Sequence, residues 1–100
     1  MKKAWLSAQA RRDLQSIRTY YSDKNAEFGL RLVQELRALA HRLAKFPIVG
    51  ADRSDLRPNL RCVAYGDYLV FYFPTESGVD VVHFLHSRRN ITGADFPESE

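Results

Sequence analysis

Residues 81–90, VVHFLHSRRN, bring together two histidines and two arginines, side chains that could act on an anion or bind one. Two histidines, His83 and His86, precede the adjacent arginines Arg88 and Arg89. Imidazoles titrate near neutral pH and suit acid–base catalysis, whereas arginines form charge-assisted bonds with phosphates or carboxylates. The segment therefore indicates either a catalytic centre acting on phosphates or a binding surface for a larger partner.

The spacing of the two histidines argues against their acting as a pair. His83 and His86 are three positions apart in a strand-like run, and such residues point to opposite faces of a strand. They are therefore poorly placed to bind one metal ion or to act on the same phosphate. The sequence also contains no CxxC, no HExxH and no Gly-rich phosphate loop. We expect no catalytic residue, no metal and no cofactor.

A second basic group contains Arg57 and Arg61. Arg57 lies in the turn-rich segment 47–59, and Arg61 starts the strand-like stretch that follows. These two arginines are further candidates for contacting a target; alternatively, they hold the loop or meet carboxylates of a partner. In an antiparallel meander this strand start and the strand end at His86 point in opposite directions. The sequence does not require the two arginine groups to form one patch.

Length and composition describe one folded domain. The chain has 100 residues, 45% of them hydrophobic, and no apolar run approaches the roughly 20 residues that span a bilayer. The apolar run near the N-terminus stops at Leu6, which is too short for a signal peptide. Cys62 is the only cysteine and is expected to be a buried structural thiol in a reducing, cytoplasmic setting. The net charge of +3 suits an acidic partner, although a basic surface without a specific partner is the alternative.

The apolar periodicity predicts two helices followed by three strands. Ser7 is a candidate N-cap for a helix reaching about Tyr21 or Asp23, and Asn25 is one for a second helix that Pro47 stops. The stretches LRCVAY, YLVFYF and VDVVHFLH are strand-like and separated by Gly66-Asp67 and PTESG, and residues 2–6 form a further short strand. The expected fold is α+β, β-α-α-β-β-β, with a helical hairpin on one face of a small antiparallel sheet. Residues 1–91 form this domain and residues 92–100 a short acidic tail.

Strand alternation gives the middle strand two apolar faces, and only one of them can meet the helices. We expect the other face to lack an intramolecular cover and to bind a partner. The alternatives are that its tyrosines tolerate exposure or that the loop partly covers it. The two alternate sets are Tyr68, Val70 and Tyr72 on one side and Leu69, Phe71 and Phe73 on the other.

The ordered set LSAQARRDLQSIRTYYSDKN, RLAKFPIVG, LRPNLRCVAYGDYLVFYF and VVHFLHSRRNI resembles the ParE branch of the ParE/RelE toxin superfamily. The resemblance is collinear from about Leu6 to Ile91. Family members usually read LRPGLRxxxxGxYRIFYR and then RVLHGRRD. The residues of this sequence that match are Leu56, Arg57, Pro58, Leu60, Arg61, Gly66, Tyr68, Phe71, Tyr72, Leu85, His86, Arg88 and Arg89.

This resemblance implies a bacterial type II toxin, active in plasmid maintenance or stress response, that inhibits DNA gyrase or topoisomerase IV by protein–protein contact. It also implies a ParD-like antitoxin whose C-terminal segment wraps the toxin in a hetero-oligomer. Neither sequence-specific DNA binding nor a membrane is implied. The target-contact candidates are Arg88, Arg89 and His86, with Arg57 and Arg61 second, and one alternate set of the middle strand is expected to bind the antitoxin.

Departures from the family pattern leave two alternatives open. Leu69, Phe73 and His83 stand where arginine is common, and Ser87 and Asn90 replace glycine and aspartate. The first alternative is an inactive homologue that still binds its antitoxin. The second is a RelE-like, ribosome-dependent mRNA endoribonuclease using His83. RelE-like enzymes spread lysines and arginines over the sheet and often carry a C-terminal tyrosine, whereas this chain has no lysine after Lys45 and no tyrosine after Tyr72.

Overall fold

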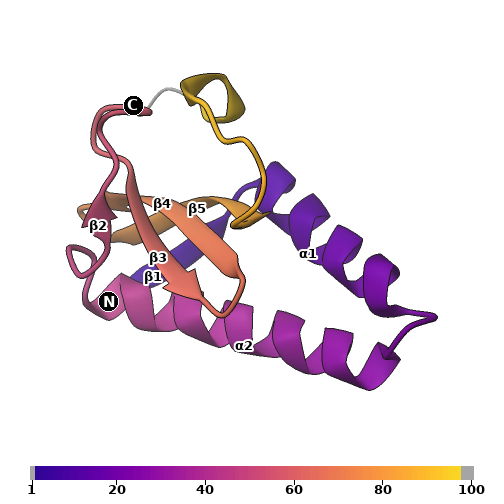
Figure 1. Ribbon diagram of the computed structural model, residues 1–100. Helices are drawn as coiled ribbons and strands as arrows, with labels where there is room; N and C mark the ends of the chain where they lie inside the picture. Colours follow the sequence, from indigo (N-terminus) through magenta and orange to yellow (C-terminus); the bar gives the residue numbers. More distant parts are fainter. Residues whose placement is uncertain (1, 98–100) are drawn as a thin grey trace.

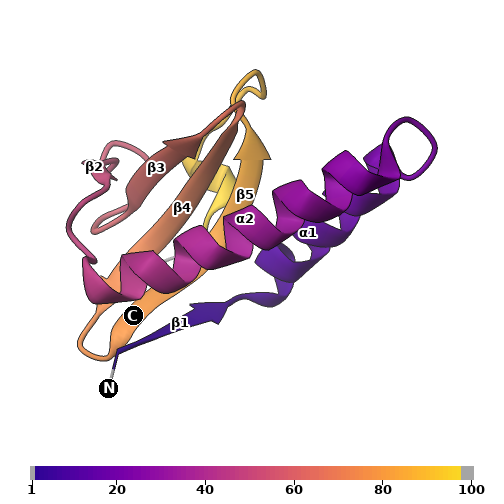
Figure 2. The same ribbon diagram turned by 90° about the horizontal axis from the view of Figure 1, so that it is seen from below.

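The chain forms two helices packed on one face of a mixed five-stranded sheet; the computed structural model describes residues 2–97 (Figure 1). The linker between the helices projects beyond the sheet in both ribbon views (Figure 2). The strand order is β1-β5-β4-β3-β2. In chain order the elements are β1 (Lys3–Leu6), α1 (Ala8–Tyr21), α2 (Ala26–Lys45), β2 (Ala51–Asp52), β3 (Arg61–Tyr65), β4 (Tyr68–Thr75), β5 (Gly78–His86) and a 3-10 turn (Gly93–Asp95).

Both helices begin and end where the sequence predicts. The Ser7 hydroxyl accepts a hydrogen bond from the N–H of Ala10 at 3.0 Å, and the Asn25 side chain accepts one from the N–H of Phe28 at 3.1 Å. These bonds satisfy backbone donors that the first helical turn leaves free. The second helix ends at Lys45, before Pro47. No helix in the described residues is long and apolar enough to cross a membrane.

The α+β class and the predicted order of elements are confirmed, but the sheet is not wholly antiparallel. Strand β1 pairs with β5 in parallel, from Lys3 opposite Gly78 to Leu6 opposite Val81. Only strands joined by a tight turn must be antiparallel, and the helical hairpin separates β1 from its partner. A second addition is β2, a two-residue strand that pairs with the start of β3.

The core on the helix side of the sheet joins both helices to the inner strands. Leu14 and Ile17 of α1 and Leu36 of α2 pack against Val70 and Tyr72 of β4. The alternation predicted for β4 is therefore confirmed, and the set Tyr68, Val70 and Tyr72 faces the helices.

The opposite face of the sheet is covered by the chain itself, so the expectation of an uncovered face was wrong. Phe71 and Phe73 pack with residues of the loop 53–60 and with Phe96, whose exposed fraction is 3%. Residues 91–97, hereafter the C-terminal segment, pass close to that loop, since a Cβ on Gly93 would lie 2.7 Å from the carbonyl oxygen of Leu56. The alternative that the loop partly covers this face is therefore confirmed, whereas cover by the C-terminal segment was not predicted, because that segment is irregular and shows no periodicity. The folded unit extends beyond residue 91, through Phe96.

Candidate functional site

The predicted cationic cluster lies in the turn that follows β5, and backbone contacts fix this turn in place. The N–H of Ser87 bonds to the carbonyl oxygen of Asp67 in the β3–β4 hairpin at 2.8 Å. The N–H of Arg89 bonds to the carbonyl oxygen of His86 at 3.0 Å, and the N–H of Arg88 bonds to the His86 Nδ1 at 3.1 Å. His86 therefore shapes the turn that presents the two arginines, as predicted for this strand end.

The two adjacent arginines have different surroundings. The Arg89 guanidinium donates a hydrogen bond to Asp95 in the C-terminal segment at 3.0 Å. The Asp95 carboxylate also accepts from the N–H of Thr92 at 2.8 Å, which closes the 3-10 turn. Arg88 is exposed, and its guanidinium forms no ion pair or hydrogen bond with residues 2–97. Arg88 is thus the member of the doublet that is free to contact another molecule.

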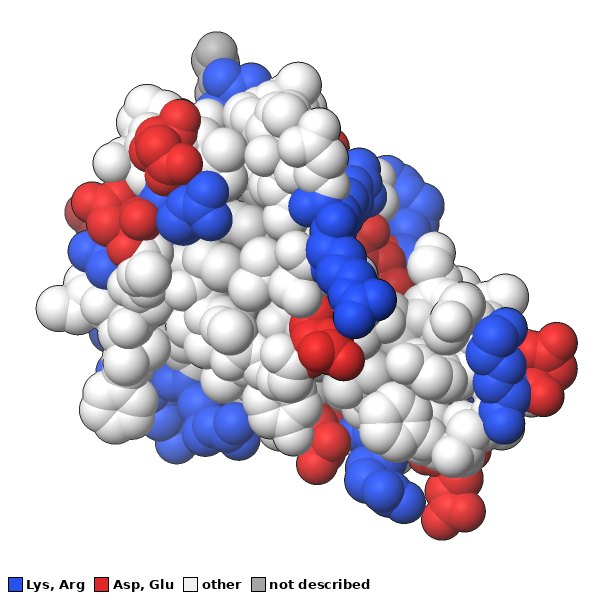
Figure 3. Space-filling model, viewed as in Figure 1, with Lys and Arg blue, Asp and Glu red and all other residues white. Residues whose placement is uncertain are grey.

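A groove lies beside this turn, between α1 and the ends of β4 and β5. Its volume is about 620 Å³, and Tyr20 and Ile17 of α1 line one wall. Tyr68, His86 and Arg89 line the other wall, and the rings of Tyr68 and His86 meet edge to face with centroids 5.3 Å apart. We call this the α1–β5 groove. Figure 3 shows basic side chains gathered where the segment after β5 meets the first turns of α1.

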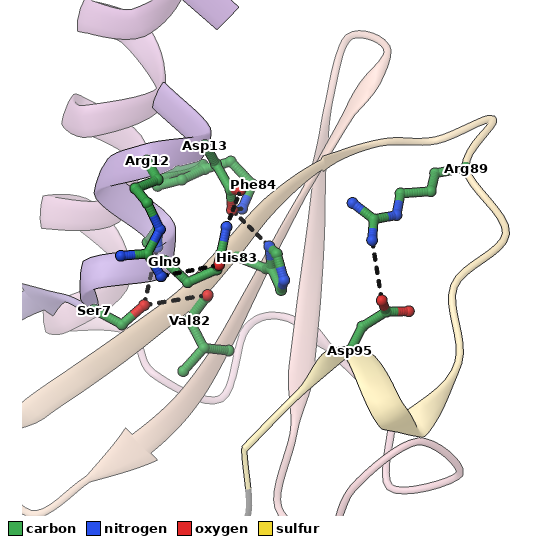
Figure 4. A network of polar contacts seen from close by, with 10 residues as sticks. Ser7, Gln9, Arg12, Asp13, Val82, His83, Phe84, Arg89 and Asp95 are labelled. Carbon is green, nitrogen blue, oxygen red and sulfur yellow. Dashed lines mark hydrogen bonds and ion pairs between the residues drawn. The ribbon is translucent and has the colours of Figure 1, made fainter. Parts of the chain in front are cut away.

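His83 is buried at the open edge of β5, next to Asp13 of α1 (Figure 4). Its Nδ1 lies 2.5 Å from the Oδ2 of Asp13 on α1, and the same oxygen accepts the N–H of Phe84 at 2.9 Å. On its other side the His83 ring meets Phe96 edge to face, with centroids 5.7 Å apart. The predicted separation of the two histidines onto opposite faces is confirmed. Asp13 itself was missed, because no local pattern links α1 to β5.

The second basic group is divided by the structure. Arg57 Nε donates to the carbonyl oxygen of Phe96 at 3.0 Å, so Arg57 holds the C-terminal segment that Arg89 also holds. Arg61 donates to the carbonyl oxygens of Ile48 at 3.1 Å and Gly50 at 2.6 Å. Arg61 lies at the opposite end of the sheet from His86, because the β3–β4 register pairs it with Tyr72 rather than with Tyr68. Both arginines therefore hold irregular segments of the chain in place, which is the alternative role that the sequence left open for them.

Neither apolar set of β4 forms a free surface. Val70, Phe71, Tyr72 and Phe73 are buried within the two cores, and only Tyr68 and Leu69 retain part of their exposure.

Cys62 of β3 is also buried. Burial raises the pKa of its thiol to about 11, which agrees with the predicted structural thiol and keeps it protonated at neutral pH.

A group of exposed apolar side chains lies instead between α2 and β3. Two hollows of about 330 Å³ each are found there, one near Phe28 and Tyr65 and one near Phe46, Val49 and Val63. Phe46 and Val49 are both 66% exposed, and the neighbouring Ile48 is 74% exposed. We call this surface the α2–β3 groove. The sequence did hold a signal for this surface: the run FPIV, directly after α2, places apolar residues in a turn, where they are not expected to be buried.

Comparison with known proteins gives one consistent result. A family model described as ParE toxin of type II toxin-antitoxin system, parDE, matches residues 5–91. Toxin ParE1 of Caulobacter vibrioides is 32% identical over 91 residues, which cover 90% of this chain and 94% of that relative. Toxin ParE3 of the same organism is 36% identical over 59 residues, and this match spans only 59% of the length of either chain.

A solved structure has the same fold. The structure described as the chromosomal ParDE TA system from P. aeruginosa superposes with a TM-score of 0.73 at 18% identity. The superposition covers 86% of this chain and 96% of that chain.

Proposed function

The chain belongs to the family of ParE toxins of type II toxin–antitoxin systems, and from this premise we propose that it inhibits DNA gyrase or topoisomerase IV by protein–protein contact, without catalysis. The observation that carries the proposal is the family match over residues 5–91. The toxin acts in the bacterial cytoplasm, where its targets are found, and a ParD-like antitoxin neutralises it in a hetero-oligomer.

The target-contact surface is the turn after β5 together with the α1–β5 groove. A rigid cationic turn supports this assignment, since backbone bonds from Ser87, Arg88 and Arg89 hold it. Arg88 presents an unpaired guanidinium that can form bidentate bonds with a carboxylate of the target or a phosphate of its DNA. Arg89 and His86 line the adjacent groove and position this turn.

The antitoxin surface is the α2–β3 groove rather than a face of β4. Amphipathic segments bind grooves of this kind by burying apolar side chains, and exposed apolar residues such as Phe46 and Val49 gain most from such cover. Arg42 lines the same hollow as Phe46 and Val49, where its guanidinium can pair with a carboxylate of an acidic antitoxin segment. Tyr68, a member of the originally predicted set, borders the second hollow and remains a candidate contact.

The geometry does not favour the ribonuclease alternative. The candidate acid–base group, His83, has a side chain that is only 7% exposed, and its Nδ1 is engaged by Asp13. A catalytic imidazole must reach the substrate directly or through one water. Phe96 closes the other side of this ring.

The proposal is tested by adding the purified full chain to DNA gyrase and topoisomerase IV in supercoiling and decatenation assays. At least one enzyme is expected to be inhibited, and the co-expressed antitoxin is expected to restore its activity. Full activity of both enzymes, together with codon-positioned cuts in ribosome-bound mRNA, would replace this proposal with the RelE-like reaction.

A further inference from the structure

A third concave region lies at the other edge of the sheet, where β1 meets both helices. It has a volume of about 550 Å³ and is separate from the α1–β5 and α2–β3 grooves. This size falls within the roughly 300–1,000 Å³ of typical small-molecule sites. We call it the β1 pocket. Its lining residues are Ala4, Trp5, Leu6, Arg11, Gln15, Arg37 and His41.

Three cationic or titratable side chains from two helices line the β1 pocket. Arg11 comes from α1, whereas Arg37 and His41 come from neighbouring turns of α2, four residues apart. The lining contains no Asp or Glu. Within residues 2–97, neither arginine forms an ion pair. Like charges held close together repel, and a bound anion would turn this repulsion into attraction.

The pocket also has an aromatic wall. Trp5 is 45% exposed although it is the largest apolar side chain in the sequence, and it lies on the edge strand β1. An exposed indole offers a flat face on which a nucleobase can stack, and such stacking does not require a particular base. Gln15, with an amide that both donates and accepts hydrogen bonds, lines the same pocket.

We propose that the β1 pocket binds a nucleoside phosphate, with the base on Trp5 and the phosphate between Arg11, Arg37 and His41. Arginines alone would accept any anion, but the indole adds a stacking surface that a simple carboxylate or inorganic phosphate leaves unused. The ligand is either a free nucleotide or one nucleotide unit of a single-stranded nucleic acid. This site is independent of the topoisomerase and antitoxin surfaces proposed above.

The chain provides its own probe for this site, because Trp5 is its only tryptophan. Trp5 fluorescence is recorded while AMP, ATP, adenosine, inorganic phosphate or a single-stranded tetranucleotide is added to the full chain. AMP or ATP is expected to change the fluorescence saturably and to bind at least about tenfold more tightly than adenosine or inorganic phosphate. If the tetranucleotide binds more tightly than AMP and ATP, the ligand is a nucleic-acid strand; the reverse order identifies a free nucleotide.

Variants of the pocket make the test specific. Arg37→Gln and Arg11→Gln are each expected to weaken nucleotide binding about tenfold, while Arg31→Gln, an exposed arginine of α2 outside the pocket, is expected to leave it unchanged. His41→Gln provides a third variant if either arginine change lowers the melting temperature. The proposal is overturned if no phosphate-bearing probe binds saturably. It is equally overturned if folded pocket variants bind as tightly as the unchanged protein, or if Arg31→Gln weakens binding as much as they do.

Discussion

Asp13 of α1 and His83 of β5 form a contact that joins the first helix to the open edge of the sheet. Their Oδ2 and Nδ1 atoms are 2.5 Å apart, and both side chains are almost fully buried. The same carboxylate accepts the N–H of Phe84 and, through Oδ1, the amide of Gln9 at 2.9 Å. Strand β1 ends at Leu6, so this edge of β5 has no neighbouring strand here. Asp13 supplies the acceptor that such a strand would have provided.

We expect Asp13→Ala to lower the free energy of unfolding by about 2 to 4 kcal/mol, because it leaves buried donors of Phe84 and His83 without an acceptor. Denaturant unfolding measures this change. Asp23→Ala, which removes an exposed carboxylate from the linker after α1, is the matched control and should change stability by less than about 0.5 kcal/mol. Equal effects of the two substitutions would show that the contact contributes nothing.

Phe96 should hold the C-terminal segment on the sheet. Its ring packs against Phe71 with centroids 4.7 Å apart, and it is buried in the second core. Phe96→Ala is expected to cost about 2 kcal/mol, less than a central core phenylalanine, because a terminal segment can detach locally. Faster hydrogen exchange at residues 91–97 would accompany the loss. Unchanged exchange and stability would mean that the segment does not cover this face in solution.

We expect the buried Cys62 thiol to lower the stability of the fold at high pH. Its pKa is raised by burial from 9.0 to about 11, so the unfolded state loses this proton first as the pH rises. The contribution of Cys62 to the free energy of unfolding is therefore constant below pH 9.0. It falls progressively as the pH rises from 9.0 to about 11. Unfolding free energies across this range should fall more steeply for the unchanged protein than for Cys62→Ala, which retains the tyrosines that titrate nearby. Identical slopes would contradict a buried thiol.

The regular elements of this fold were readable from local signals. Ser7 and Asn25 cap the two helices, and Gly66-Asp67 closes the β3–β4 hairpin, as their residue types predict. The parallel pairing of β1 and the packing of Phe96 depend on contacts between distant segments, which no periodicity encodes. For the same reason the sequence placed Arg88 and Arg89 together but could not foresee that Asp95 engages only one of them.

The α2–β3 groove should be where the antitoxin binds. Phe46→Ala is expected to weaken antitoxin binding by about 2 kcal/mol, roughly thirtyfold, because an exposed aromatic is a typical anchor for a partner. Isothermal titration with the antitoxin measures the change. Leu30→Ala alters an exposed apolar residue of the same helix that does not line the groove, and it should have little effect. Loss of affinity in Leu30→Ala alone would move the interface to another face of α2.

Inhibition of the topoisomerase by an Arg88 variant tests the central claim most directly. Arg88 is the better choice than Arg89, because changing Arg89 also removes its bond to Asp95, which helps to hold the C-terminal segment. With the supercoiling or decatenation assay of the sensitive enzyme, Arg88→Ala should raise the toxin concentration for half-inhibition at least about tenfold. The melting temperature and antitoxin affinity should stay unchanged. Arg31→Ala, which removes an exposed arginine of α2, should inhibit like the unchanged toxin. If Arg88→Ala inhibits as strongly as Arg31→Ala, the turn after β5 is not the surface that contacts the target.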